Sequence, residues 1–163
     1  QMVGRRTPPE DTVLDRVDEL PCELSRLDYV DHSSALRIMG KADELCLLLA
    51  DVPGAERVMP GKTFEYLGTG RDILAIAPPG ELRNVLRGYS GVSIFSPHNV
   101  TGICEHLAQR LNSTASAATH ERQLERFDRK QQAGRLAELL EQTSGSVARS
   151  LSASQQLLAD TAL

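Results

Sequence analysis

The sequence predicts an α/β protein, a Rossmann-like three-layer sandwich with a parallel sheet and a long C-terminal helix. Short apolar segments alternate with segments of helical periodicity, roughly every 20 to 25 residues. These apolar segments lack polar alternation, which is typical of strands covered on both faces. Because parallel strands with right-handed crossovers end at one edge, we expect the loops 4–9, 51–62 and 78–80 to line a ligand-binding edge.

The first forty residues contain two candidate strands and two candidate helices. A strand ends at Gly4, and a helix begins near Glu10 and stops at Pro21, because its apolar residues recur at helical spacing. A second strand is expected within 24–30. A second helix, capped by Ser33 or Ser34, should end near residue 40.

Three apolar strands follow, at 44–50, 73–77 and 91–95. A helix beginning at Lys62 connects the first two, and the glycines of Gly68-Thr-Gly70 end it. These glycines follow a helix and precede a strand, which is the reverse of the dinucleotide-binding order. The remaining helices should begin after Gly80 and after the segment 96–99.

The chain changes character after residue 111. Residues 112–119 form a connector of small residues, and 120–142 has the pattern of a charged helix. We expect the apolar residues of this helix to form a buried stripe: Leu124, Phe127, Leu136, Leu139 and Leu140. The expected division is one domain over 1–142 and a C-terminal helix or tail over 143–163.

Composition limits the classes of function. The 163 residues carry a net charge of −4 with acids and bases interspersed, which argues against a nucleic-acid partner. No signal peptide is visible and the longest apolar run, 45–50, is far short of the roughly 20 residues of a membrane span. We therefore expect a cytoplasmic protein, although membrane association stays open. The chain begins within a strand, so we expect a fragment.

The cysteines and histidines form no recognisable site. Three isolated cysteines argue against a disulfide scaffold or a zinc ribbon, and Cys46 is expected to pack in the interior. His32 and His98 are expected to be caps or surface residues, and His106 and His120 to be solvated. The spacing indicates no protein-held metal and no covalent nucleophile.

The most informative segment is 60–77, which predicts a loop, a helix, a glycine stop and a strand. Gly61, Lys62 and Thr63 open the helix, so their N–H groups can face an anion. Glu65 shares a helical face with Lys62, where its carboxylate would suit a ribose diol. An ordinary surface pair, worth ~0.2–0.5 kcal/mol, is the alternative explanation. The preceding Pro-Gly loop and the following strand favour a nucleotide site.

Several blocks resemble one known family. Pro60-Gly-Lys-Thr-Phe-Glu-Tyr-Leu-Gly-Thr-Gly-Arg-Asp-Ile-Leu-Ala75 is close to "P-x-K-x-F-E-Y-L-A-x-G-x-P-I-L-A". Weaker blocks are Met2-Val-Gly4, Tyr29 to Leu36, Met39 to Leu49 and the segment 121–140. Together they resemble the C-terminal, donor-binding half of GT-B type glycosyltransferases, of the kind called glycosyltransferase group 1 or family four.

The resemblance implies a function and roles for residues. Glu65 would bind the donor ribose, and Gly61-Lys62-Thr63 would lie against the diphosphate of a nucleoside-diphosphate sugar. No cofactor is implied, because basic groups and amides stabilise the leaving group in place of a metal. Arg5 could reach a phosphate, or it could belong to an ordinary charged turn. Catalytic residues are not assigned.

Two departures from the family pattern affect these roles. Arg57 stands where many members carry a glutamate that contacts the sugar, so its role there is a phosphate or sugar contact at most. Asp72 replaces a proline. The family's first strand and its N-terminal acceptor-binding domain should precede Gln1, so we expect the fragment alone to be inactive. A non-catalytic α/β interaction module and a nucleotide-sugar epimerase or hydrolase remain as alternatives.

Overall fold

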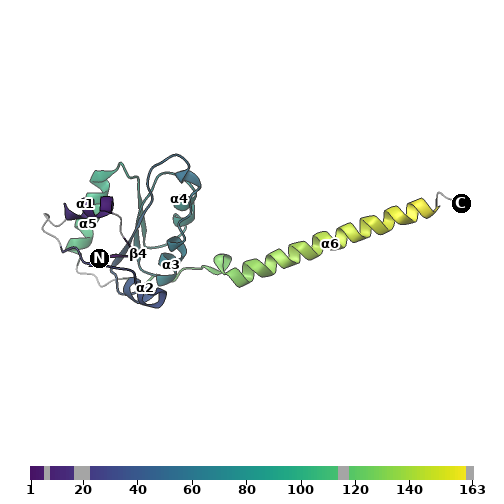
Figure 1. The fold of residues 1–163 in the computed structure, drawn as a ribbon, viewed down its shortest axis with the longest axis horizontal. Helices are drawn as coiled ribbons and strands as arrows, with labels where there is room; N and C mark the ends of the chain where they lie inside the picture. The colour runs from purple at the N-terminus through teal and green to yellow at the C-terminus, as the bar shows by residue number, and fades with distance from the viewer. Residues whose placement is uncertain (6–7, 17–22, 114–117, 161–163) are drawn as a thin grey trace. The chain divides into compact units, whose positions relative to one another are not determined.

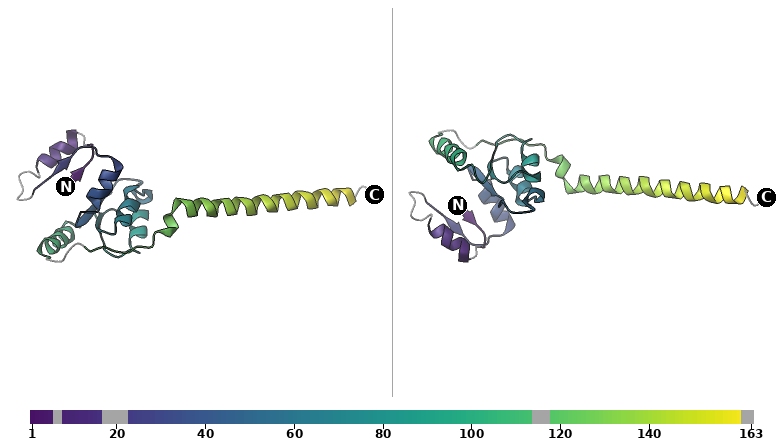
Figure 2. Two further views of the ribbon diagram at one scale, coloured as in Figure 1. Left: turned by 90° about the horizontal axis from the view of Figure 1, so that it is seen from below. Right: turned by 90° about the horizontal axis from the view of Figure 1, so that it is seen from above.

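The computed structural model describes residues 1–5, 8–16, 23–113 and 118–160. It is a mixed α/β protein whose strands all pair in parallel and whose last element is a long helix (Figures 1 and 2). The chain divides into two compact units, Gln1–Arg122 and Gln123–Leu163. The α/β class and the long C-terminal helix predicted from the sequence are confirmed.

A three-stranded sheet forms the centre of the first unit. Strands β3 (Glu44–Leu48), β4 (Asp72–Ile76) and β5 (Val92–Phe95) follow one another in the order β3-β4-β5. Leu45 pairs with Ile73, and Ile73 pairs with Val92. Helices α3 (Lys62–Thr69) and α4 (Glu81–Leu86) make the two crossovers between these strands. The predicted strands and helices of this region are therefore confirmed to within a few residues.

The hydrophobic core lies between this sheet and its crossover helices. Its fully buried members include Leu67 of α3, Ile73 of β4, and Leu82 and Leu86 of α4. Burial of each such side chain stabilises the fold by about 1.5–3 kcal/mol. Helix α3 ends as predicted, because Gly70 adopts the left-handed conformation with φ 71° that favours glycine.

A second, two-stranded parallel sheet contains β1 (Met2–Val3) and β2 (Arg26–Leu27). Helix α1 (Pro8–Asp15) lies between these strands in the sequence, and residues 17–22, which include the predicted helix stop at Pro21, lie outside the described residues. Helix α2 (His32–Met39) is capped by Asp31, not by Ser33 or Ser34. Hydrogen bonds from the Ser33 and Ser34 hydroxyls and from the Ser34 N–H hold the pKa of Asp31 well below its usual value.

Helix α5 (Val100–Asn112) follows β5 and is capped by Asn99, whose side chain accepts a hydrogen bond from the Gly102 N–H. The connector continues to Arg122, with residues 114–117 outside the described part of the chain. Its last residues contact the three-stranded sheet. The His120 N–H donates to the Gly70 carbonyl at 2.8 Å, so this segment belongs to the first unit.

The second unit is mostly helical. A short 3-10 turn, η2 (Glu125–Phe127), precedes helix α6 (Arg129–Asp160). The prediction of a helix from residue 120 was wrong, because α6 starts at Arg129, where the Asp128 side chain caps it by accepting a hydrogen bond from the Gln131 N–H. The predicted buried stripe was also wrong within this unit, where Leu136, Leu139 and Leu140 are exposed. The expected boundary after residue 142 falls inside α6.

Candidate functional site

The candidate site lies at the carboxyl edge of the three-stranded sheet, where α3 begins. The chain leaves β3 at Leu48 and reaches α3 at Lys62, so the N-terminus of this helix lies on the carboxyl side of the strands. Gly61 precedes the helix, is exposed and has no side-chain cap. Among the described residues, no acceptor is found for the N–H groups of Gly61 and Lys62. Such N–H groups attract anions.

Thr63 differs from the sequence-based expectation. Its N–H donates to the Pro60 carbonyl at 3.0 Å, and its side chain is fully buried. Its hydroxyl oxygen has no hydrogen-bond partner among the described residues. The amide of Thr63 is therefore not free for an anion, because the turn that enters the helix already uses it.

The Glu65 carboxylate is exposed one turn into α3, and His32 at the start of α2 is its neighbour. The distance between His32 Nδ1 and Glu65 Oε1 is 4.0 Å. Lys62 on the same helix is also exposed. The N-terminal end of α3 therefore presents two backbone amides, an ammonium group and a carboxylate to solvent. Together these groups can bind a phosphate and a diol. No local pattern in the sequence indicates that His32 lies beside Glu65.

The loops that follow the three strands meet at this edge. The loop after β4 touches the loop after β3, since a Cβ atom added to Gly80 would lie 2.4 Å from the Glu56 carbonyl oxygen. The loop after β5 joins them through His98, whose Nε2 lies 3.0 Å from Asp51 Oδ2. His98 is exposed, as expected, yet its hydrogen bond was missed because Asp51 lies 47 positions away.

Within the described part of the chain, two further predicted residues make no hydrogen bond or ion pair with α3. Arg5 is exposed after β1. Arg57 ends the 3-10 turn η1 (Ala55–Arg57), where its Nε lies 3.3 Å from the Glu56 carboxylate. Both residues are exposed, so their guanidinium groups are accessible to solvent.

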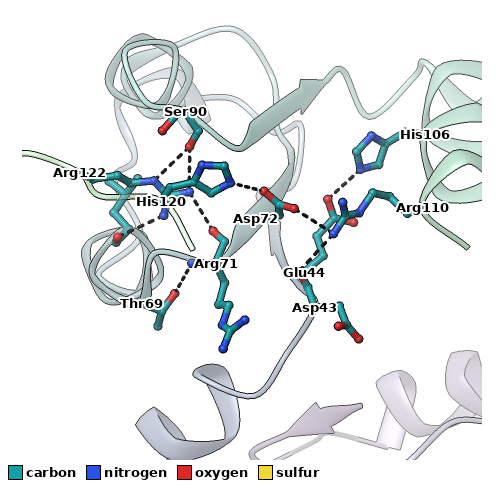
Figure 3. A network of polar contacts seen from close by, with 11 residues as sticks. Asp43, Glu44, Thr69, Arg71, Asp72, Ser90, His106, Arg110, His120 and Arg122 are labelled. Atoms are coloured by element: carbon teal, nitrogen blue, oxygen red, sulfur yellow. Dashed lines mark hydrogen bonds and ion pairs between the residues drawn. The ribbon is translucent and has the colours of Figure 1, made fainter. Parts of the chain in front are cut away.

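A network of polar contacts lies at the opposite, amino edge of the sheet (Figure 3). Asp72, at the start of β4, accepts from Arg110 of α5 at 2.9 Å and from His120 of the connector at 2.6 Å. His106 pairs with Glu44 at 2.8 Å, and both side chains are largely buried. The expectation that His106 and His120 are solvated was therefore wrong. Both histidines attach later segments to the starts of strands.

Arg122 completes this network with hydrogen bonds to three backbone carbonyls. Its guanidinium donates to Leu67 at 3.2 Å, to Arg71 at 2.8 Å and to Ser90 at 2.9 Å. Partial burial lowers the pKa of this guanidinium, and nearby Asp72 opposes the shift. These groups are occupied with one another, so the amino edge is a structural clamp. The contacts of Asp72 with Arg110 and His120 give this residue a structural role at the position where the resembled family has a proline.

Comparison of the chain with protein-family models, curated proteins and solved structures finds no match. In the described ranges, no three metal-binding side chains gather closely enough to hold an ion. No helix of those ranges has both the length and the hydrophobicity of a membrane span. Function is therefore inferred from the geometry of the carboxyl edge.

Proposed function

We propose that this chain is the donor-binding part of a GT-B type glycosyltransferase, which transfers a sugar from a nucleoside-diphosphate sugar to an acceptor. One observation supports this proposal above the others. An exposed carboxylate, Glu65, lies one turn into a helix whose free amide end is at the carboxyl edge of a parallel sheet. Open α/β sheets bind ligands at this edge.

Each part of the site has a chemical role in this proposal. The N–H groups of Gly61 and Lys62, with the Lys62 ammonium, hold the diphosphate at the positive end of the helix. The Glu65 carboxylate accepts hydrogen bonds from the two ribose hydroxyls. Such bonds to a charged acceptor contribute about 1.5–3 kcal/mol each in favourable geometry. No protein-held metal has a role here.

The test is ligand-observed NMR with uridine, guanosine and adenosine diphosphates. We expect the wild-type chain to bind at least one of them, and Glu65→Gln to weaken that binding about 10-fold or more, which corresponds to about 1.4 kcal/mol. Glu81→Gln is the matched control, because Glu81 is an exposed glutamate in the first turn of α4.

A nucleotide without the two ribose hydroxyls sharpens this test. The 2′,3′-dideoxy diphosphate should bind weakly to the wild type, and Glu65→Gln should weaken it no further, since both changes remove the same hydrogen bonds. Equal affinities of wild type and Glu65→Gln for the ribonucleotide would refute the role of Glu65. Absence of binding to every nucleotide would favour the non-catalytic interaction module.

A further inference from the structure

Helix α6 has no cover within its own unit. It is one uninterrupted helix of 32 residues, which corresponds to a length of about 48 Å. The other described element of that unit, η2, spans three residues and is too short to cover it. Leu136, Leu139 and Leu140 in the first half of α6 are 58%, 61% and 59% exposed. Exposed leucines at helical spacing are typical of a helix that packs along a partner.

The composition of α6 also indicates that the helix needs a partner. It contains two glycines and six serine or threonine residues, all of which have low helix propensity. Helices in water gain most of their stability from packing of an apolar face, and little from propensity. A helix of this length and composition is therefore stabilised by a contact that extends along it.

The apolar positions of α6 repeat with a fixed period. We name five of them the α6 stripe, and they are separated alternately by four and seven positions: Leu136, Leu140, Val147, Leu151 and Leu158. The pattern therefore repeats every eleven residues, which keeps it on one face of a nearly straight helix. Arg129, the first residue of α6, is the one charged residue at the angular position of the stripe. The face of the stripe is therefore uncharged beyond that residue.

The charges of α6 favour a protein partner over a membrane surface. A helix that lies on lipid usually has a polar face rich in lysine and arginine, with aromatic residues among its apolar ones. Helix α6 has no aromatic residue, and its seven charged residues are of both signs: Arg129, Lys130, Arg135, Glu138, Glu141, Arg149 and Asp160. This mixture is typical of a helix that packs against another helix in water.

We propose that α6 pairs with α6 of a second copy of this chain, as a parallel, in-register two-helix dimer held by the α6 stripe. The uncharged stripe is self-complementary, because two copies in register bring each apolar position against the same position of the partner. The charged residues after Arg129 lie at other angular positions, so the pair does not bring like charges together in its centre.

The sequence of the stripe favours the parallel arrangement. In a parallel pair, leucine meets leucine at 136, 140, 151 and 158. An antiparallel pair centred on Val147 would instead place Leu140 opposite Ser154, and Leu151 opposite Thr143. That arrangement buries hydroxyl groups against leucine, which costs free energy unless the hydroxyls find hydrogen-bond partners.

The size of the contact fits a reversible dimer. Two helices about 48 Å long that meet along a strip about 10 Å wide cover roughly 480 Å² on each helix, or about 1,000 Å² together. This area is near the lower limit for specific protein interfaces, which usually bury about 1,200–2,000 Å². We therefore expect a dissociation constant in the micromolar range, so dimerisation should depend visibly on protein concentration.

The first test is the mass of the whole chain in solution, measured by light scattering under reducing conditions between about 1 and 500 µM protein. We expect the mass to rise from the 17.8 kDa of one chain toward twice that value. Leu140→Lys combined with Leu151→Lys should weaken the dimer at least about 100-fold, because it places charges in the apolar contact. Gln131→Lys combined with Ser152→Lys is the matched control, since it adds the same charge on the opposite face. Circular dichroism checks that both variants fold.

The second test is disulfide cross-linking, which does not depend on the lysine variants. In a background with Cys22, Cys46 and Cys104 replaced by serine, Ala133→Cys adds one thiol beside the stripe. The parallel pair brings the two copies of residue 133 together, whereas the antiparallel pair would separate them by about 40 Å. On mild oxidation, we expect Ala133→Cys to form a linked dimer at least about 10-fold faster than Ser152→Cys on the opposite face.

Three results would overturn the proposal. One is the mass of a single chain at every concentration tested. Another is a dimer that the two lysines in the stripe leave unchanged, because the contact would then lie elsewhere. The last is a dimer in which Ala133→Cys cross-links no faster than Ser152→Cys, because the helices would then not be parallel and in register. The stripe contains no residue of the candidate site, so nucleotide binding can succeed or fail independently of this dimer.

Discussion

Asp72→Asn should destabilise the first unit by about 2 kcal/mol. The Asp72 side chain is 14% exposed and bridges Arg110 and His120, with distances of 2.9 and 2.6 Å. Hydrogen bonds to a charged group contribute about 1.5–3 kcal/mol each. Asparagine keeps one acceptor oxygen but loses the charge, so roughly half of this contribution is lost. Because the Arg110 side chain is 33% exposed, water can compensate part of the lost interaction with Asp72.

The assay is urea unfolding followed by tyrosine fluorescence. The chain has three tyrosines and no tryptophan, and Tyr29, Tyr66 and Tyr89 all lie in the first unit, so the second unit does not contribute to the signal. With an m-value of about 2 kcal/mol/M, the midpoint should fall by about 1 M.

The matched control is Asp51→Asn, which changes another Asp–His pair. Both members of this pair are exposed, and such pairs contribute about 0–1 kcal/mol. If the two substitutions lowered stability equally, or if Asp72→Asn cost less than about 1 kcal/mol, the amino-edge network would not be the clamp that its geometry indicates.

Three further changes test the packing of the first unit. Gly80→Ala should lower the free energy of unfolding, measured with urea, by about 2–4 kcal/mol, because φ is 154° and the added Cβ would lie 2.4 Å from the Glu56 carbonyl oxygen. Gly61→Ala is the control and should change the free energy of unfolding little, because the space around Gly61 is open. Leu67→Ala should cost about 2–5 kcal/mol by the same measurement, and Leu139→Ala on exposed α6 should stay within about 0.5 kcal/mol. Burial raises the pKa of Tyr66. The stability that comes from its protonated hydroxyl is therefore fully present below the unfolded-state pKa of about 10, and it is lost as the pH rises through the folded-state pKa. Tyr66→Phe should therefore reduce the loss of stability measured between about pH 9 and 12.

The elements of the three-stranded sheet could be predicted from the sequence because local signals mark them. Gly70 ends α3, Gly80 precedes α4, and each of the three strands is mostly apolar. The tip of α3 was identified for the same reason, since Gly61 and Lys62 carry a local signature. Thr63 was misplaced there because a hydrogen bond to Pro60, which closes the entering turn, leaves no trace in residue type.

Contacts between distant positions could not be predicted. The partners of Asp72 lie 38 and 48 positions further along the chain, and nothing in the local pattern of His120 distinguishes a partly buried, hydrogen-bonded ring from a solvated one. Cys46 was expected to be buried because its strand is apolar, and it is exposed because it points to the face of β3 opposite the buried Leu45 and Leu47. Periodicity likewise shows that α6 has an apolar stripe, but it does not show whether a neighbour covers this stripe.

The position of Arg122 has a practical consequence for dissecting this protein. It is the last residue of the first unit, and its hydrogen bonds to backbone carbonyls connect the end of α3, the residue before β4 and the loop that enters β5. A shortened version designed from the helices and strands alone would stop near Asn112 and would lose this tie. Fragments for crystallisation, as well as protease-trimmed samples, should therefore retain the chain through Arg122.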